Sequence, residues 1–485
     1  MQFNDLADFL ATLEDLGELV RVSVEVDPVM EIAELTDRIC KTSNGGPAIL
    51  LENVRGSTFP AVVNLLGNER RIALALRSNS LSETIEKIDR LLHPDLPENW
   101  LGSLKLIPQL AQLTKLPPKT VKTAPSQQVV KVGRDVDLRE LPLLQNRPLE
   151  RQPVLTGGQV FTTHPETGIR DVSTAIFSMR DQNSFHIHWN PQENGWKNYV
   201  AYRDEGRQMP IAIALGGDPV LSLMASAPLP YETDGCLLAG FFRGTNLELI
   251  KGRSVPLEVP ASADVVIEGL IDVEAEPVRG EPVALPTGFY SEPEETPVLN
   301  VTTVTHRSNP VIPAIVHGVP PGEKNQMDLA LERLLLPVVR TFFPEIVDVH
   351  RPLTGATSNV LFVRLKKQYP QHARKVMSAL LGMNSFATTK FMVAVDADVD
   401  IRDESRVWFH VAANTHPGRD TAILEGPAHH WDHASPVRGV GSKLCIDATR
   451  KLPEEGHPRE WPEEAEMTRR VRELVDRRWQ EYGLS

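Results

Sequence analysis

The sequence has few cysteines and no long apolar run. Its three cysteines, Cys40, Cys236 and Cys445, are widely spaced and form no CxxC pair. This usage speaks against a disulfide framework and favours a reducing cytoplasm. No run of about 18 apolar residues occurs, and the N-terminal stretch MQFNDLADFLATLEDLGELV carries acids where a signal peptide carries bases. We therefore expect a cytoplasmic chain with no integral membrane segment.

Basic residues are in deficit, since 51 Lys and Arg face 64 Asp and Glu and leave a net charge of −13. A chain with this balance is a poor match for nucleic acid or for an anionic membrane surface. The motifs GxxxxGK[ST], GxGxxG, GxSxG and HExxH are also missing from useful contexts. These absences leave a globular protein of ordinary hydrophobic content, with 41% apolar residues. Its 485 residues predict two or three domains.

Changes in helical and strand periodicity and in proline content divide the chain into four regions. Residues 1–105 mix helical and strand periods and predict an N-terminal α/β domain. Residues 106–152 are rich in proline and predict a linker and an entry strand. Residues 153–310 are dominated by strands and predict an antiparallel barrel or sandwich. Residues 325–485 predict a C-terminal α/β domain, which we expect to serve in oligomerisation.

Two helices stand out in this last region. The first is expected over Met327–Phe342, with Pro337 kinking or ending it. The second, over Glu463–Tyr482, is charged but carries one apolar stripe. A terminal helix of this kind packs either on its own core or on a partner subunit.

The centre of the chain predicts a hairpin. Gln159–Thr163 and Ile169–Met179 are rich in β-branched and aromatic residues, and HPETG between them supplies the proline and glycine of a turn. Downstream, His186 and His188 alternate on one strand, which suits two metal ligands or an ordinary strand face. With no third ligand at a telling spacing, we favour the structural interpretation of these histidines. The same holds for the cluster from His429 to His433.

Several motifs then appear in a fixed order along the chain. They are HPETGIRD at 164–171, IAIALGGDP at 211–219, LEVPASADVVIEG at 257–269, TGFY at 287–290, TTKFMVAVDADVDIRD at 388–403 and DHASPVRGVGSKLCIDAT at 432–449. Together they resemble the UbiD family of non-oxidative decarboxylases, which includes 3-octaprenyl-4-hydroxybenzoate carboxy-lyase. Within that family the chain is most similar to the menaquinone-biosynthesis branch.

The resemblance implies a mixed α/β fold whose central split β-barrel binds prenylated FMN together with a divalent metal, Mn or Mg. It implies a small aromatic or unsaturated acid as substrate, and assembly as a homo-oligomer. The modified flavin is an electron sink, so the protein has to orient the substrate and supply a proton. In the family an Asn, a His and a Glu hold the metal, and a Glu–Arg–Glu/Asp network handles protons.

Carried onto this sequence, the family's cofactor positions change character. The metal Asn falls on Asp171 and the metal His on Gln192. The metal Glu falls on Gly235, with Asp234 one residue earlier. We therefore expect Asp171 and Asp234 as metal ligands. The full set of expected cofactor-binding residues is Asp171, Gln192, Ser226, Asp234 and Lys390.

The proton-handling positions change more. The catalytic Arg falls on Ile176, and the two acids fall on Gly280 and Leu285, with Glu281 adjacent to the first. Glu281 is thus the candidate catalytic acid. Two hypotheses follow, a prenyl-FMN-dependent decarboxylase or a catalytically degenerate paralogue that serves as a structural or regulatory subunit beside an intact homologue. A third is altered chemistry that uses Asp171, Asp234 and Glu281.

Overall fold

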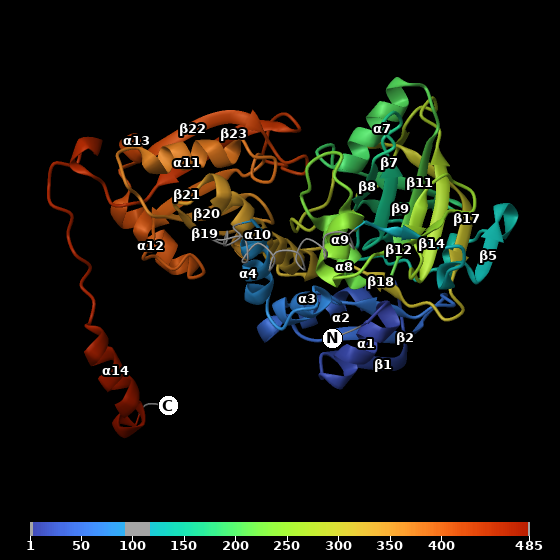
Figure 1. Ribbon diagram of the computed structural model, residues 1–485, viewed down its shortest axis with the longest axis horizontal. Helices are drawn as coiled ribbons and strands as arrows, with labels where there is room; N and C mark the ends of the chain where they lie inside the picture. Colours follow the sequence, from blue (N-terminus) through green and yellow to red (C-terminus); the bar gives the residue numbers. More distant parts are fainter. Residues whose placement is uncertain (1–2, 93–116, 484–485) are drawn as a thin grey trace, which may run out of the picture.

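A computed structural model describes residues 3–92 and 117–483 of the chain. Figure 1 shows a blue N-terminal region below a green and yellow central sheet, with an orange C-terminal sheet to one side. The fold is therefore of the mixed α/β class that the sequence predicts. The expected boundary at residue 105 and the start of the 106–152 linker lie outside the described residues.

The N-terminal region packs helices on a small sheet. The side chain of Asp5 caps α1 (Leu6–Asp15) by accepting a hydrogen bond from the Asp8 N–H at 3.0 Å. The sheet order is β1 (Leu19–Val26), β2 (Ala48–Val54), β3 (Ala61–Val63) and β18 (Ile312–Ala314). Because β18 follows the central sheet in sequence, this region is completed by a strand that returns from the barrel. The remaining helices are α2 (Glu31–Cys40), α3 (Glu69–Ala75) and α4 (Leu81–Leu92).

The central sheet is antiparallel throughout its described pairs. Its order is β6 (Val154–Leu155), β9 (Ile176–Asp181), β10 (Ser184–His188), β17 (Val298–His306), β14 (Val265–Ile271), β11 (Met209–Leu215), β7 (Gln159–Thr163) and β8 (Arg170–Ser173), with β5 (Val129–Val132) also on β17. The predicted hairpin is confirmed as β7 and β8, which pair Thr163 with Arg170. Gly168 takes a φ of +68° in its turn, a conformation that glycine adopts without strain.

This sheet must curl on itself. β8 lies at one end of the strand order and β9 lies next to the other end. Yet Ser173 ends β8 and Ile176 begins β9. Three residues of extended chain span only about 10 Å. The two ends of the sheet therefore meet, and the sheet forms a half-barrel.

Three helices accompany the half-barrel. They are α7 (Asn194–Asp204), α8 (Pro219–Ser226) and α9 (Gly235–Arg243). All three contact β8, so they cover the end of the sheet that carries Asp171. Two small sheets complete the region, β13 (Glu258–Pro260) with β12 (Glu248–Lys251) and β4 (Lys119–Thr120), and β15 (Val278–Arg279) with β16 (Glu295–Thr296).

The C-terminal sheet is mixed. Its order is β19 (Ile346–His350), β20 (Val360–Leu365), β21 (Phe391–Asp396), β23 (Val440–Asp447) and β22 (Thr421–Pro427), with β20, β21 and β23 parallel. Around it lie α11 (His372–Leu381), α12 (Glu404–Asn414) and α13 (Pro417–Asp420). The strands and helices of this region alternate, as in β20, α11 and β21.

The long helix α10 (Glu323–Phe342) excludes one of the two effects expected of Pro337, namely that it ends the helix. The helix begins earlier than predicted and runs through Pro337 to Phe342 without ending there. A proline inside a helix costs about 3 kcal/mol because it removes a hydrogen bond and crowds the preceding turn. Here Leu336 and Val339 on either side are buried in the C-terminal core, and burying such side chains offsets the cost.

The final helix lies away from the rest of the chain. α14 (Arg469–Arg478) is shorter than the predicted Glu463–Tyr482 helix, and a 3-10 turn over Trp479–Tyr482 follows it. Figure 1 shows it at the end of an extended segment, and none of its residues is buried against the described chain. Of the two packing modes left open by the sequence, the described residues exclude packing on its own core.

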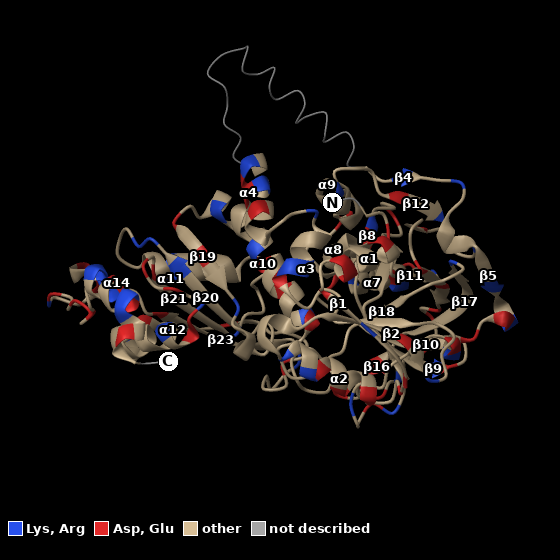
Figure 2. Cartoon of the chain, turned by 90° about the horizontal axis from the view of Figure 1, so that it is seen from below, with Lys and Arg blue, Asp and Glu red and all other residues tan. Residues whose placement is uncertain are grey.

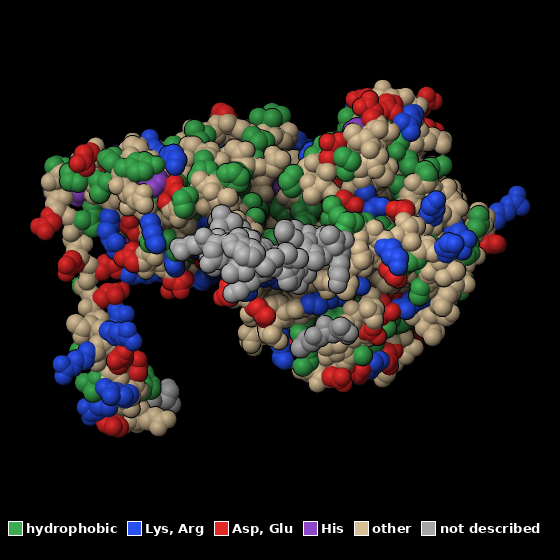
Figure 3. All heavy atoms as spheres, in the orientation of Figure 1, with side chains coloured by type: hydrophobic (Ala, Val, Ile, Leu, Met, Phe, Trp, Pro, Cys, Tyr) green, Lys and Arg blue, Asp and Glu red, His purple; other side chains and the backbone are tan. Residues whose placement is uncertain are grey.

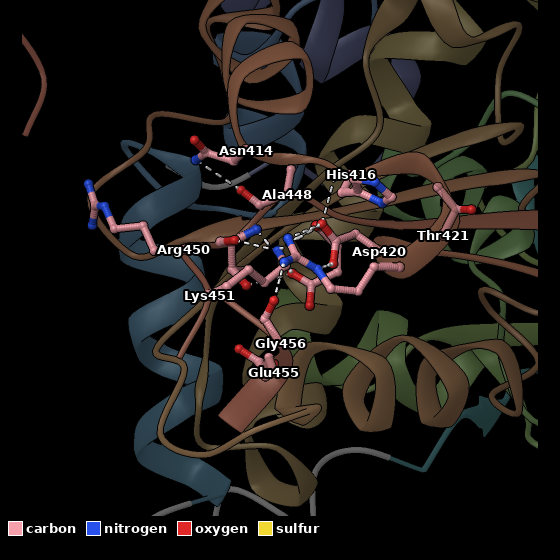
Figure 4. A network of polar contacts seen from close by, with 12 residues as sticks. Asn414, His416, Asp420, Thr421, Ala448, Arg450, Lys451, Glu455 and Gly456 are labelled. Carbon is pink, nitrogen blue, oxygen red and sulfur yellow. Dashed lines mark hydrogen bonds and ion pairs between the residues drawn. The ribbon is translucent and has the colours of Figure 1, made fainter. Parts of the chain in front are cut away.

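A buried ionic network closes the C-terminal region (Figure 4). The Lys451 side chain is 1% exposed, and its ammonium donates to Asp447 Oδ1 at 3.2 Å and lies 3.9 Å from Asp420 Oδ2. Glu455 binds Lys367 at 2.5 Å within the same interior. Buried charges need such partners, because an unpaired charge is costly away from water. The network fixes the segment after β23 against α13.

Charges elsewhere are mixed. Figure 2 shows basic and acidic residues side by side on most elements, with no face of one sign in that view. Among the described helices, none is long and apolar enough to cross a membrane.

Candidate active site

A cavity of about 580 Å³ lies where the half-barrel meets the C-terminal domain. Its walls come from β8 and β9, from the starts of α7 and α10, and from C-terminal loops around residues 351, 385 and 429. Figure 3 shows hydrophobic side chains gathered at a hollow between the two lobes on this face. A space of this size accommodates a cofactor or a small ligand.

Asp171 occupies the half-barrel side of the cavity. It lies on β8, is 7% exposed, and its Oδ2 finds no hydrogen-bond partner among the described residues. Burial raises the pKa of this carboxyl to about 6, and Lys197 opposes that rise. Asp171 is therefore an oxygen ligand or hydrogen-bond partner waiting for a bound group.

Glu193 lies beside it. It is the residue before α7, and its side chain does not cap the helix. Burial raises the pKa of Glu193 to about 8, while Lys324 lowers it and both Asp171 and Asp328 raise it. Acids with strongly raised pKa values in a cleft are candidates for proton transfer. The resemblance did not point to Glu193 because it follows the family's metal position instead of occupying it.

One wall of the cavity is apolar where the family has its charge network. Ile176 and Leu285 belong to one buried cluster with Val154, Val283 and the partly buried Trp431. Ile176 is 5% exposed and Leu285 1% exposed. The two replacements at the Arg and acid positions therefore pack in a common apolar cluster, of which Ile176 and Trp431 line the cavity.

The C-terminal side supplies charges that sequence reasoning missed. Arg351 and Glu332 both line the cavity, and the Arg351 Nε lies 3.8 Å from Glu332 Oε2. Glu332 is 2% exposed, and burial raises its pKa to about 7. Lys324, which pairs with Asp328, lines the same side. In the sequence, the charged residues of α10 look like those of any surface helix. Only the structure shows that this part of α10 lies at the cavity.

The structure brings three of the predicted site residues together. Asp171, Gln192 and Ser226 line the cavity. The Gln192 side-chain amide donates to the Ala428 carbonyl at 3.0 Å, which ties the half-barrel to the C-terminal domain. The Ser226 Oγ is buried and has no hydrogen-bond partner in the described chain.

The other three lie outside the cavity lining. Asp234 caps α9 through the Cys236 N–H and forms an ion pair with Arg170 at 2.9 Å. Lys390 binds Asp432 at 2.6 Å. Glu281 is partly buried just after β15. The cavity is thus lined by only one of the three predicted acids.

The residues present fit a flavin better than they fit its metal. The unpartnered hydroxyls of Ser226 and Thr287 in the described chain can donate hydrogen bonds to a phosphate or ribityl chain, and the Asp171 carboxylate can accept one from a ribityl hydroxyl. A metal needs a convergent ligand set, and the described residues contain no group of three or more His, Cys, Asp or Glu that could hold one. Gly235 leaves no side chain at the family's metal Glu position, and Asp234 is held by Arg170. We therefore derive no step through a metal.

The two strand histidines have side-chain partners, although His188 also lines the cavity and its Nδ1 has no partner among the described residues. His188 Nε2 lies 2.9 Å from Ser178 Oγ, and His186 Nδ1 lies 3.1 Å from Thr296 Oγ1, so each ring has a side-chain partner. Burial lowers the pKa of His188 to about 4, which keeps it neutral at physiological pH.

Comparison with known proteins identifies the family. Three family models of 3-octaprenyl-4-hydroxybenzoate carboxy-lyase match in chain order, the N-terminal domain at residues 10–91, the Rift-related domain at 119–320 and the C-terminal domain at 325–448. An uncharacterized protein of Aquifex aeolicus (strain VF5) is 39% identical over 483 residues, which are 100% of this chain and 99% of that protein. The chain belongs to the UbiD family.

Solved structures share the fold. The closed form of the vanillic acid decarboxylase of Sedimentibacter hydroxybenzoicus has a TM-score of 0.86 and 24% identity, over 99% of each chain. The UbiD-class enzyme HmfF of Pelotomaculum thermopropionicum, in complex with FMN, has a TM-score of 0.77 and 28% identity, over 95% of this chain and 97% of that one. An evolved dimeric form of HmfF in complex with prFMN matches with a TM-score of 0.77 and 27% identity, over the same shares.

Proposed function

We propose that this chain is a carboxy-lyase that removes carbon dioxide non-oxidatively from an aromatic or unsaturated carboxylic acid. The observation that carries the proposal is the cavity of about 580 Å³ at the meeting of half-barrel and C-terminal domain, with one apolar wall and one charged wall. Such a cavity suits a flat ring that bears an acid group. A naphthoate of menaquinone biosynthesis is the substrate we propose within this class.

Prenylated FMN is the proposed cofactor, and when bound it supplies an electron sink for the departing carboxyl group. Ser226 and Thr287 would donate hydrogen bonds to it. Ile176 and Trp431 would pack against the substrate ring and keep water from it, with Leu285 packed behind them. Asp171 and Gln192 remain proposed cofactor contacts, whereas Asp234, Lys390 and Glu281 would need to move to reach the cavity.

Reconstitution tests this function. Purified chain loaded with prenylated FMN should show the absorbance of the bound flavin and release carbon dioxide from one of a panel of hydroxybenzoic, vanillic and naphthoic acids. Retained flavin without release from any acid would count against a decarboxylase. Failure to retain any flavin would end the proposal.

A second candidate function is a non-catalytic subunit, favoured by the packed cluster of Ile176 and Leu285. Replacing a buried charge network by apolar residues is often neutral or stabilising, so the fold survives the loss of chemistry. Such a subunit should co-purify with an intact homologue from its own cells. Turnover by the isolated chain would contradict this alternative.

A further inference from the structure

An arginine and a glutamate of the C-terminal domain, Arg351 and Glu332, line the cavity. Arg351 follows β19, and Glu332 lies on α10, so the two come from different elements of the C-terminal domain. The Arg351 backbone N–H donates to Glu332 Oε1 at 3.2 Å, and the guanidinium Nε is 3.8 Å from Oε2. The backbone hydrogen bond fixes the carboxyl group, while its second oxygen stays open.

That open oxygen is the unusual feature. Glu332 is 2% exposed, yet its Oε2 has no hydrogen-bond partner among the described residues, and neither has Arg351 Nε. Buried polar atoms are normally paired, so two unpaired atoms on residues that line one cavity mark a place for a polar ligand group. The separation of 3.8 Å is too long for a direct hydrogen bond.

Arg351 is held firmly. Its Nη2 donates to the Ser385 carbonyl at 2.5 Å, and its guanidinium lies over the Phe386 ring at 5.2 Å from the centroid. A guanidinium held on both sides keeps its position when a ligand enters. It is therefore able to stabilise a carboxylate at a fixed point of the cavity.

The charges around Glu332 favour a group that gains and loses a proton near neutral pH. Burial raises its pKa to about 7, Arg351 and Arg402 lower it, and Asp348 raises it. On its own helix, the nearest charged groups that line the cavity are Asp328 and Lys324, which pair with each other. An acid with its pKa near the working pH is suited to general acid catalysis.

We propose that Glu332 and Arg351 form the proton-transfer pair of this cavity, with Glu332 as the acid and Arg351 as the residue that positions it. The inference rests on the proposed function. As the bond between ring carbon and carboxyl carbon breaks, carbon dioxide leaves and the electron pair remains with the substrate. Glu332 donates its proton to that carbon, and Arg351 stabilises the carboxylate that remains. Solvent then returns a proton to Glu332.

A binding experiment tests the pair without turnover. Calorimetry with benzoate as the probe, in two buffers of different ionisation enthalpy at pH 7.5, measures the protons taken up on binding. A carboxylate beside Glu332 should draw a proton onto it, so the wild-type chain should take up protons and Glu332→Gln should take up none. Equal uptake by both chains, or uptake lost in Glu193→Gln but kept in Glu332→Gln, would overturn the proposal.

Turnover gives the second readout. In the reconstituted chain, Glu332→Gln should slow carbon dioxide release by about a hundredfold or more, and wild-type kcat should fall as the pH rises above about 7 because the acid form is lost. Arg351→Lys should keep part of the rate that Arg351→Met loses. Glu345→Gln, which changes a buried acid outside the cavity, should leave the pH profile of kcat unchanged.

The outcomes separate the two claims. If the wild-type chain releases no carbon dioxide from any acid but shows proton uptake that depends on Glu332, the proposed function fails and the acid pair stands. If the wild-type chain is active and Glu332→Gln keeps its rate and pH profile, the pair fails and the proposed function stands. Circular dichroism and thermal melting of each variant exclude misfolding as the cause of a loss.

Discussion

Ile176, which lines the cavity, packs in one buried cluster with Leu285, although the two residues are far apart in the sequence. Their positions correspond to an arginine and an acid in the family that the chain resembles. Replacing only the arginine or only the acid by an apolar residue would have left the other charge buried without a partner, which is strongly destabilising. The apolar pair therefore packs consistently, and the charged residues that line the cavity, which include Glu193, Glu332 and Arg351, lie elsewhere.

Restoring the arginine alone should harm the fold. We expect Ile176→Arg to lower the free energy of unfolding by about 3–5 kcal/mol, because the new charge would be buried without a partner. Adding Leu285→Glu should recover part of that loss. Urea denaturation of both single variants and the double variant measures the coupling, and Ile176→Leu is the control for packing. An Ile176→Arg chain as stable as wild type would show that water reaches this wall.

Asp171 should make flavin binding depend on pH. Its pKa is raised to about 6, chiefly by burial, so the carboxyl is neutral below that pH and repels a phosphate above it. We expect FMN affinity to fall as the pH rises through about 6, and Asp171→Asn to weaken that dependence. Quenching of flavin fluorescence measures both chains, with the exposed Asp204→Asn as control. The same slope in all three would show that Asp171 does not face the phosphate.

Glu323 should make stability depend on pH in the N-terminal region. It accepts a hydrogen bond from the Leu66 N–H at 2.7 Å, and burial raises its pKa to about 7. The folded chain therefore holds a proton that the unfolded chain has released, and its stability falls as the pH rises from about 4.5 to about 7. Between pH 5 and 8, Glu323→Gln should gain about 3 kcal/mol relative to wild type.

Denaturation at the two pH values measures this change. Glu454→Gln, at an exposed position, should show no such shift. A constant difference between Glu323→Gln and wild type would mean that the Glu323 carboxyl titrates normally in the folded chain.

The exposed face of α14 should hold an oligomer together. Val471 is 40% and Leu474 44% exposed, and both lie on the stripe that the sequence predicts. We propose that this stripe packs on a second copy of the chain, since it covers none of the described residues of its own chain. Val471→Asp with Leu474→Asp should reduce the mass found by light scattering to that of one chain, whereas Asp476→Asn should not. A wild-type chain that is already monomeric would contradict the proposal.

Local pattern was enough to predict much of the fold. The hairpin of β7 and β8 follows from strand-forming residues around a turn with Pro165 and Gly168, and those preferences act within a few residues. The apolar face of α1 follows equally from helical spacing. The alternative that Pro337 ends the helix was wrong because the cost of proline is local, whereas the burial of Leu336 and Val339 that offsets it depends on tertiary packing.

The site was only partly predictable for the same reason. Asp171 and Ser226 line the cavity, as expected from motifs whose spacing is kept. The pairing of Asp234 with Arg170 depends on how α9 docks on β8, which no spacing shows. The meeting of Glu332 with Arg351 depends on how α10 packs beside β19, so neither residue was distinguishable from a surface charge. Whether Asp234, Lys390 and Glu281 take part in the function stays a prediction.

The hydrogen bond from Gln192 to the Ala428 carbonyl crosses from one lobe to the other at the rim of the cavity. A ligand enclosed by both lobes is released only when such links break, so their strength sets its residence time. Substitution of Gln192 should thus shorten the lifetime of the complex between chain and ligand, while each lobe unfolds at its usual temperature. Faster release of the ligand at unchanged thermal stability would show that the contact between the lobes is lost and the fold is kept.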